Sequence, residues 1–459
     1  MTAPAALAAP PLDLWPAEVM AKIRDRATLN HELAVHAGYF DVYYDSEVGD
    51  AKWADGSPPY AIHAGGTIRV HGFLASPLVG GPYPAIVVGH GHGGHGSPEI
   101  ALALAALGYV VLSIDGPGQG QSTGAPDTVQ GWISVEEQLN TPAPELSYLY
   151  HYAYAGMRGL TLLDHLSQLP FNPLRIDRDR LGVIGASMGG QFTYYINGVD
   201  DRVKAAVAIA VAGDWRNLLA YEGSWLYHGF YYYTRDGLRS GQDALNTVSN
   251  VCTDPTLQTF LSNFDPIQYA PRQHAPLLTI IGSHDQYFTL PSINTTFDRI
   301  ASAGTNPRFL KRLMITPNGE HGVINENDLL PTLLPVLADI DGWLAYSFRN
   351  GATPPATPTV SLSLEGQHMR FRVSAPAGGS SLRNVSLHYA SQIDTLPEAP
   401  CDFARLELSP TAPDVYEGTL PVGTFPACGP AVTSDNVLYY ASAADDANFT
   451  VSSKLYYRG

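Results

Sequence analysis

Short apolar runs alternate with helical stretches through the middle of the chain. Seven runs have the length and composition of strands: 67–75, 84–90, 109–115, 180–186, 203–211, 276–282 and 309–316. Residues 98–108, after the second run, have helical character and end at Gly108, a residue that suits the end of a helix. Strands that alternate with helices are typical of a mostly parallel sheet with flanking helices. The pattern therefore predicts an α/β domain over residues 65–348.

The pattern changes after residue 348. Residues 328–348 predict a last helix, interrupted by Pro331 and Pro335. Residues 349–358 are rich in Pro, Thr and Gly and predict a linker. Beyond it, short alternating segments are separated by Gly, Pro, Asn and Asp, which is typical of a small immunoglobulin-like β-sandwich. We therefore predict a second, all-β domain over residues 359–459.

Two segments lie outside the alternation. Residues 1–64 are expected to pack on the α/β domain. Residues 214–271 form a long insertion crowded with aromatic residues, and such insertions serve as a lid, a pocket wall or an oligomer contact. Trp225, Tyr227 and Tyr231 are candidates for the wall of a substrate pocket. The alternative is a locally buried aromatic cluster.

The charge balance restricts the partners. The chain has 26 Lys and Arg against 43 Asp and Glu, a net charge of −17. Nucleic acids and anionic membrane surfaces both attract cationic residues, so neither is an expected partner. No apolar run approaches the roughly 18 residues that suggest a transmembrane helix. The expected partner is instead a small molecule or a carbohydrate that serves as substrate, and the oligomeric state stays open.

Cysteines and the N-terminus bear on the compartment. Cys401 and Cys428 are a candidate disulfide, which would suit an exported protein, although two reduced thiols are the alternative. Cys252 has no CxxC or metal-ligand spacing. The N-terminus, "MTAPAALAAPP", lacks the basic region and apolar core of a signal peptide. On the basis of the candidate disulfide, we expect a secreted or periplasmic protein.

Gly185-Ala186-Ser187-Met188-Gly189 follows an apolar run and precedes a helical stretch. A serine at a sharp strand-to-helix turn takes a strained backbone conformation and needs very small neighbours on either side. The start of the helix directs backbone N–H groups toward developing negative charge. Ser187 is therefore the candidate nucleophile, and the N–H of Met188 is one candidate oxyanion donor.

Such a serine needs a base, which in turn needs an orienting acid. On this kind of turn the chain order is Ser, acid, His. Asp285 follows the apolar run "PLLTIIG", and His321 follows the next run. Asp214, in "VAGDW", is the rival acid, and we favour Asp285. We expect His284 to be structural.

"GHGHGGHG", residues 89–96, contains His90, His92 and His95. The H-x-H-x-D-H ligands of dinuclear metal hydrolases are similar, but Gly94 stands where that pattern needs aspartate. The other interpretation is a loop in which glycines let a backbone N–H approach a substrate oxygen. We favour that loop, with Gly91 or His92 as second oxyanion donor, and expect neither metal nor cofactor.

A second glycine-rich stretch, "SIDGPGQGQS", spans residues 113–122. A dinucleotide loop of the form G-x-G-x-x-G would need glycine at position 121, where Gln121 stands. We therefore expect a tight turn in which Asp115 accepts hydrogen bonds from loop backbone.

Together, "HGFLASP", "GHGHGG", "DGPGQGQS", "LPFNPLRIDRDRLGVIGASMGG", "IIGSHD" and "NGEHG" resemble the acetyl xylan esterase, dienelactone hydrolase and prolyl oligopeptidase group of α/β-hydrolases. The resemblance implies that fold and a serine esterase. Dienelactone hydrolases use a cysteine nucleophile, whereas position 187 is serine. Peptidases of the group carry an N-terminal β-propeller, for which the residues before 65 are too few. The C-terminal sandwich is not standard for the minimal esterases.

The expected function is hydrolysis of carboxylic esters through an acyl-enzyme. The substrate would be a short-acyl ester, such as an acetylated carbohydrate, or an aromatic ester. One alternative is a peptidase or amidase with the same three residues. Another is a non-enzymatic binding protein in which the sandwich does the recognition. A third is a metal-dependent hydrolase, which chelators would inactivate.

Overall fold

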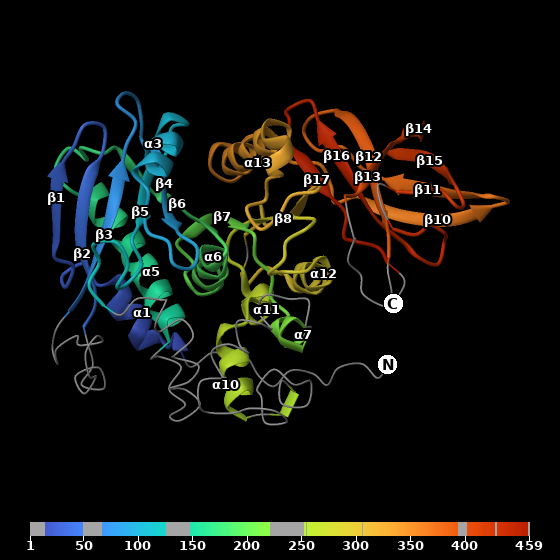
Figure 1. The fold of residues 1–459 in the computed structure, drawn as a ribbon. Coiled ribbons are helices and arrows are strands. Elements are labelled where there is room, and N and C mark those ends of the chain that lie inside the picture. The colour runs from blue at the N-terminus through green and yellow to red at the C-terminus, as the bar shows by residue number, and fades with distance from the viewer. Residues whose placement is uncertain are drawn as a thin grey trace. The chain divides into compact units, whose positions relative to one another are not determined.

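The computed structural model describes residues 14–48, 67–124, 147–220, 252–253, 255–304, 306–392, 402–426 and 429–457 (Figure 1). The chain divides into two compact units. Unit 1 consists of Met1–Ala206, Gly213–Ala275 and Ile300–Asn306, and unit 2 of Val207–Ala212, Pro276–Arg299 and Pro307–Gly459. Strand β7 (Val203–Ile209) contributes residues to both.

Unit 1 is built on a mixed sheet. Its strands are β1 (His31–Val35), β2 (Phe40–Val48), β3 (Thr67–Ala75), β4 (Tyr83–Gly89), β5 (Val110–Ile114), β6 (Ile176–Ala186) and the start of β7. They follow the order β1-β2-β3-β5-β4-β6-β7. Strand β4 pairs parallel with β5 and β6, whereas β1, β2, β3 and β5 pair antiparallel with their neighbours in that order. The expected parallel strands are therefore extended by an antiparallel edge.

Strands β1 and β2 lie in the segment that was expected only to pack on the α/β domain. In β2 the side chains of Val42, Tyr44 and Ser46 are buried and alternate with partly exposed ones. This period of two is typical of a strand with one face on the core. The buried Tyr44 hydroxyl donates a hydrogen bond of 2.9 Å to the carbonyl of Ala155, so the edge strands are tied to a core helix.

Unit 1 also contains helices, some of which pack on this sheet. They are α1 (Ala17–Arg24), α3 (Pro98–Ala106), α5 (Tyr148–Ser167), α6 (Met188–Val199), α7 (Trp215–Ala220), α10 (Pro255–Phe264), α11 (Pro266–Tyr269) and the 3₁₀ helix η4 (Ala270–Arg272). Helix α3 begins where the Ser97 hydroxyl accepts a hydrogen bond from Ile100 N. It packs against β3 and β5, while α5 and α6 pack against β4 and β6.

Unit 2 contains the end of β7 and the parallel pair β8 (Leu277–Gly282) and β9 (Lys311–Thr316). Its helices are α12 (Leu290–Arg299), the 3₁₀ turn η5 (Glu326–Asp328) and α13 (Leu329–Arg349). Helix α13 is continuous, although two prolines were expected to interrupt it. Pro331 lies in the first turn, where backbone N–H groups have no helical acceptor. Pro335 lacks the backbone N–H that would donate one hydrogen bond in the helix interior. Burial of Trp343 and Leu344 on the same helix offsets the loss of that hydrogen bond.

Of the helices in the described ranges, one segment, Glu326–Arg349, is long and apolar enough to cross a membrane by length and composition alone. Within its apolar 18-residue window, 33% of the residues are buried. Core helices of globular proteins meet the same criterion, so the expectation that this chain has no membrane segment stays a prediction.

Residues beyond 358 form two antiparallel sheets in unit 2, drawn in orange and red in Figure 1. One contains β10 (Thr359–Glu365), β11 (His368–Ser374), β15 (Val415–Pro421) and β14 (Ser409–Ala412). The other contains β13 (Ala404–Glu407), β12 (Leu382–Ser391), β16 (Val437–Asp445) and β17 (Thr450–Ser452). Met369, Phe371 and Leu387 are fully buried in a core shared by both sheets. The prediction of a small all-β domain is confirmed.

Candidate active site

Ser187 lies at a sharp turn in unit 1, between the end of β6 and the start of α6. Its backbone has φ 57° and ψ −118°, a strained combination for a residue with a side chain. A β-carbon on Gly185 would lie 2.1 Å from the Gly189 carbonyl oxygen, and one on Gly189 would lie 2.3 Å from the Gly89 carbonyl oxygen. Both glycines of the motif are therefore required by close packing around the serine.

The loop of residues 89–96 runs beside Ser187. A β-carbon on Gly91 would lie 3.3 Å from the Ser187 β-carbon, so the Gly91 backbone passes next to the serine. The N–H of Gly94 donates to the Gly91 carbonyl over 3.0 Å and closes a turn. At Gly93, φ is +68°, and a β-carbon there would meet nothing within 4 Å. Its positive φ gives Gly93 a backbone reason to be glycine.

The histidine at the start of this loop is bound to backbone atoms. His90 Nδ1 is 2.7 Å from the Gly91 carbonyl, and His90 Nε2 accepts a 2.9 Å hydrogen bond from Gly116 N. The Tyr152 hydroxyl donates to the His90 carbonyl over 3.0 Å. His92 and His95 are exposed. Within the ranges given above, no three His, Cys, Asp or Glu side chains are grouped so that they could hold a metal ion.

The far end of the loop is held by Asp115, which accepts hydrogen bonds from Gly96 N at 2.7 Å and from Gln121 N at 2.8 Å. His71 Nδ1 lies 2.7 Å from the same carboxylate. Burial raises the pKa of Asp115, but these hydrogen bonds outweigh burial and hold the pKa below its ordinary value. The expected tight turn is present, and it anchors the loop that passes Ser187.

Asp285 and His321 form a hydrogen-bonded pair in unit 2. Asp285 follows β8 and is 7% exposed. Its Oδ2 lies 2.9 Å from His321 Nδ1, and its Oδ1 accepts from Tyr287 N at 2.8 Å and Phe288 N at 2.9 Å. The Tyr287 ring stacks on the imidazole at a centroid distance of 4.1 Å. With Nδ1 donating to the carboxylate, Nε2 carries the lone pair that a general base uses.

Asp214, the rival acid, has other hydrogen-bond partners. Its carboxylate accepts from Asn217 Nδ2 over 2.7 Å, and its carbonyl accepts from Asn217 N over 3.0 Å. These contacts organise the start of α7. The buried Asp265 lies beneath this turn and accepts from Trp215 N over 2.8 Å. The contacts of Asp214 thus favour a structural role for it.

Burial raises the pKa of Asp265 to about 7. Since the folded protein holds this proton more tightly than the unfolded chain, the contribution of Asp265 to stability is complete below the ordinary pKa of 3.8 and is lost as pH rises through about 7. We expect wild type to lose stability relative to Asp265→Asn as pH rises from 5 to 8, measured by urea unfolding midpoints. A stability difference that does not change with pH would contradict this assignment.

Several predicted residues lie outside the described ranges. They are the candidate pocket residues Trp225, Tyr227 and Tyr231, and the candidate disulfide cysteines Cys401 and Cys428. Of the long insertion, residues 214–220, 252–253 and 255–271 are described, and Cys252 is an exposed free thiol. The pocket wall and the disulfide that were expected at the five residues outside the described ranges stay predictions.

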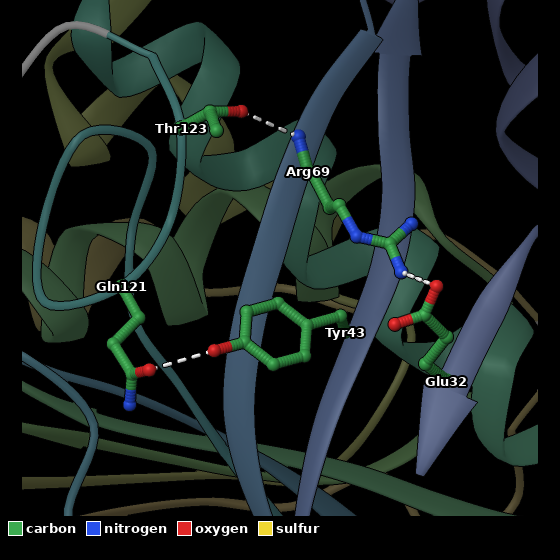
Figure 2. Close-up of a pocket in the computed structure, with 5 residues that line it drawn as sticks. All are labelled: Glu32, Tyr43, Arg69, Gln121 and Thr123. Carbon is green, nitrogen blue, oxygen red and sulfur yellow. Dashed lines mark hydrogen bonds and ion pairs between the residues drawn. The ribbon is translucent and has the colours of Figure 1, made fainter.

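A pocket of about 250 Å³ opens in unit 1 (Figure 2). It is lined by Glu32, Tyr43, Arg69, Gln121 and Thr123. Arg69 pairs with Glu32 at 2.8 Å, and the Tyr43 hydroxyl donates to Gln121 over 2.6 Å. Its walls come from β1, β2, β3 and the turn after β5, and the sequence analysis predicted no pocket at this place.

Residues 160–395 match the family described as PhoPQ-activated pathogenicity-related protein. That span is more than half of the 459 residues. The chain belongs to this family. It is also 28% identical over 231 residues to the protein named "Putative hydrolase YtaP" of Bacillus subtilis (strain 168). The aligned region covers 47% of this chain and 64% of that protein. The chain thus spans less than two thirds of that relative's length.

Among solved structures, acetyl xylan esterases are similar in fold. The enzyme from Paenibacillus sp. R4 has a TM-score of 0.51 and 20% identity, over 71% of this chain and 91% of that one. Acetyl xylan esterase 1 from Thermoanaerobacterium sp. JW/SL YS485 also has a TM-score of 0.51 and 20% identity, over 74% of this chain and 94% of that one. The α/β-hydrolase fold that the motifs implied is therefore confirmed.

Proposed function

We propose that the protein is a serine hydrolase of carboxylic esters. The observation that carries the proposal is Ser187, held at a strained turn between a strand and a helix by glycines that leave no room for a side chain. A residue in such a conformation is stabilised only where the surrounding structure over-determines it, and such residues cluster at active sites. The hydrogen-bonded pair of Asp285 and His321 supports the proposal independently.

In the proposed reaction, Ser187 Oγ attacks the acyl carbonyl while His321 Nε2 takes its proton. His321 then returns the proton to the leaving alcohol, and an acyl-enzyme remains on Ser187. A water molecule, activated by the same imidazole, releases the acid. Asp285 keeps the imidazole in the tautomer that can accept a proton. No cofactor takes part in this scheme.

Negative charge that develops on the carbonyl oxygen needs backbone donors. The N–H groups at the start of α6 have no helical acceptor, and the first of them belongs to Met188. We propose Met188 N–H as one donor and the N–H of Gly91 or His92 as the other. The close approach of Gly91 to Ser187 supports the second assignment.

For the substrate we propose a short-acyl ester, such as an acetylated carbohydrate. The fold neighbours named acetyl xylan esterases favour this class. A panel of p-nitrophenyl esters from acetyl to octanoyl, together with aminoacyl p-nitroanilides, tests it. We expect kcat/KM to be highest for acetyl and EDTA to leave it unchanged. Turnover of the anilides alone, or loss of activity with EDTA, would overturn the proposal.

Gly91→Val should reduce kcat by about 10² to 10³, the cost of one lost oxyanion donor. The branched side chain would start 3.3 Å from the Ser187 β-carbon and displace the loop backbone. His95→Ala is the matched control, because that side chain is exposed and contacts its neighbouring backbone. If His95→Ala were the more damaging variant and stoichiometric zinc were found, the metal interpretation would replace the oxyanion loop.

A further inference from the structure

Two loops of unit 2 are interlocked by backbone hydrogen bonds. We call residues 283–285, after β8, the acid loop and residues 317–321, after β9, the histidine loop. Ser283 N donates to the Thr316 carbonyl over 3.0 Å, and His284 N donates to the Gly319 carbonyl over 2.8 Å. Asn318 N donates to Ser283 Oγ over 2.8 Å. Asp285 and His321 are therefore presented by two loops that are joined by hydrogen bonds.

The side chain of Asn318 binds the C-terminal domain. Its Oδ1 accepts a 2.7 Å hydrogen bond from Phe403 N, and its Nδ2 donates to the Phe403 carbonyl over 3.3 Å. Phe403 immediately precedes β13, which pairs with β12. One amide side chain thus satisfies both backbone groups of a residue in the sandwich.

The ring of Phe403 provides a second contact with the same loops. Phe403 is 5% exposed. Its ring meets His284 edge-on, at a centroid distance of 5.9 Å and an angle of 83°, and packs against Tyr440 of β16 at 5.3 Å. The acid loop therefore touches the sandwich through His284, and the histidine loop touches it through Asn318.

The backbone conformation at position 318 also favours asparagine. Its φ is 58°, in the left-handed region that asparagine tolerates better than most residues do. The left-handed turn directs the chain from β9 toward His321, while the amide fixes the outside of that turn to residue 403. Two separate features of one residue thus determine where the histidine loop lies.

We propose that Asn318 and Phe403 form a clamp through which the C-terminal sandwich positions the loops of Asp285 and His321. Asn318 and Phe403 are positioning residues and touch no reacting atom. The inference rests on the proposed ester hydrolysis and assigns the sandwich a part in it. Misplacing a catalytic group by about 1 Å can cost on the order of 10² in rate, so a loosened clamp should lower kcat more than it weakens substrate binding.

The test compares Asn318→Gly, Phe403→Ala and Phe403→Leu in the full chain. Glycine retains the left-handed backbone and removes only the amide, while leucine retains apolar bulk at 403. We expect kcat for p-nitrophenyl acetate to fall about 10- to 100-fold in the first two variants, with KM within roughly twofold and with Phe403→Leu close to wild type. The double variant Asn318→Gly/Phe403→Ala should lose less than the product of the single losses, because both act on one contact.

Asn448→Gly is the matched control. Asn448 also has a left-handed backbone, with φ 66°, and lies in the exposed turn between β16 and β17. We expect wild-type kcat from it. Thermal unfolding of every variant separates loss of fold from loss of positioning.

The outcomes separate the clamp from the function. An active wild type whose kcat is unchanged by Asn318→Gly and Phe403→Ala would overturn the clamp and leave the esterase proposal standing. A lowered unfolding temperature with unchanged kcat would also overturn it, since the contact would then serve stability alone. Absence of ester turnover in wild type would instead overturn the proposed function.

Discussion

Ser187→Ala is expected to remove ester turnover and leave the fold intact. The hydroxyl is only partly buried and its loss leaves a very small void, so the cost to packing is small. Alanine has the same backbone strain at φ 57° as serine does. Loss of the nucleophile from a Ser-His-Asp triad costs about 10⁴ to 10⁶ in kcat. The catalysis that remains comes from substrate binding and the oxyanion donors. The measurements are kcat/KM for p-nitrophenyl acetate and the thermal unfolding midpoint.

Ser262→Ala serves as its control. The Ser262 hydroxyl donates within its own helix, to the Thr259 carbonyl over 2.9 Å, so the variant should retain wild-type turnover. If a folded Ser187→Ala protein hydrolysed the ester at a near wild-type rate, the nucleophile assignment would be wrong.

Asp285→Asn is expected to lower kcat by about 10⁴, the second largest effect. Asparagine can keep one oxygen on Tyr287 N and Phe288 N, which now donate to Oδ1. Its NH₂ group would then face His321 Nδ1, where a carboxylate oxygen now lies at 2.9 Å. The imidazole would respond by carrying its proton on Nε2, the nitrogen that should accept the serine proton. The loss therefore appears in kcat without a matching loss of stability.

Asp214→Asn tests whether Asp214, and not Asp285, is the acid that orients the histidine. The Asp214 carboxylate accepts a hydrogen bond from Asn217 Nδ2, a contact that the asparagine oxygen can preserve. We expect its kcat to stay within a few-fold of wild type. A larger loss in Asp214→Asn than in Asp285→Asn would transfer the acid role to Asp214.

Features encoded by neighbouring residues were predictable from the sequence. The turn at Ser187 depends on glycines two residues away on either side, because the steric demand of a strand-to-helix turn is local. Apolar runs of strand length identified β3 to β9, because buried strands need apolar side chains wherever they meet the core. Alternating segments after residue 358 identified the sandwich for the same reason.

Contacts between distant residues were decided only by the tertiary structure. Asp214 and Asp285 both follow a strand, and what distinguishes them is the 2.9 Å contact between Asp285 and His321. His90 lies in a histidine-rich loop that resembles a metal site, yet its ring nitrogens meet the backbone of Gly91 and Gly116. No local pattern encodes such pairings, because they depend on where each loop ends and how its side chain is directed. For the same reason the sequence by itself determined the serine turn and the two kinds of domain, whereas the hydrogen bond from Phe403 N to Asn318 of the histidine loop emerged only once the chain was folded.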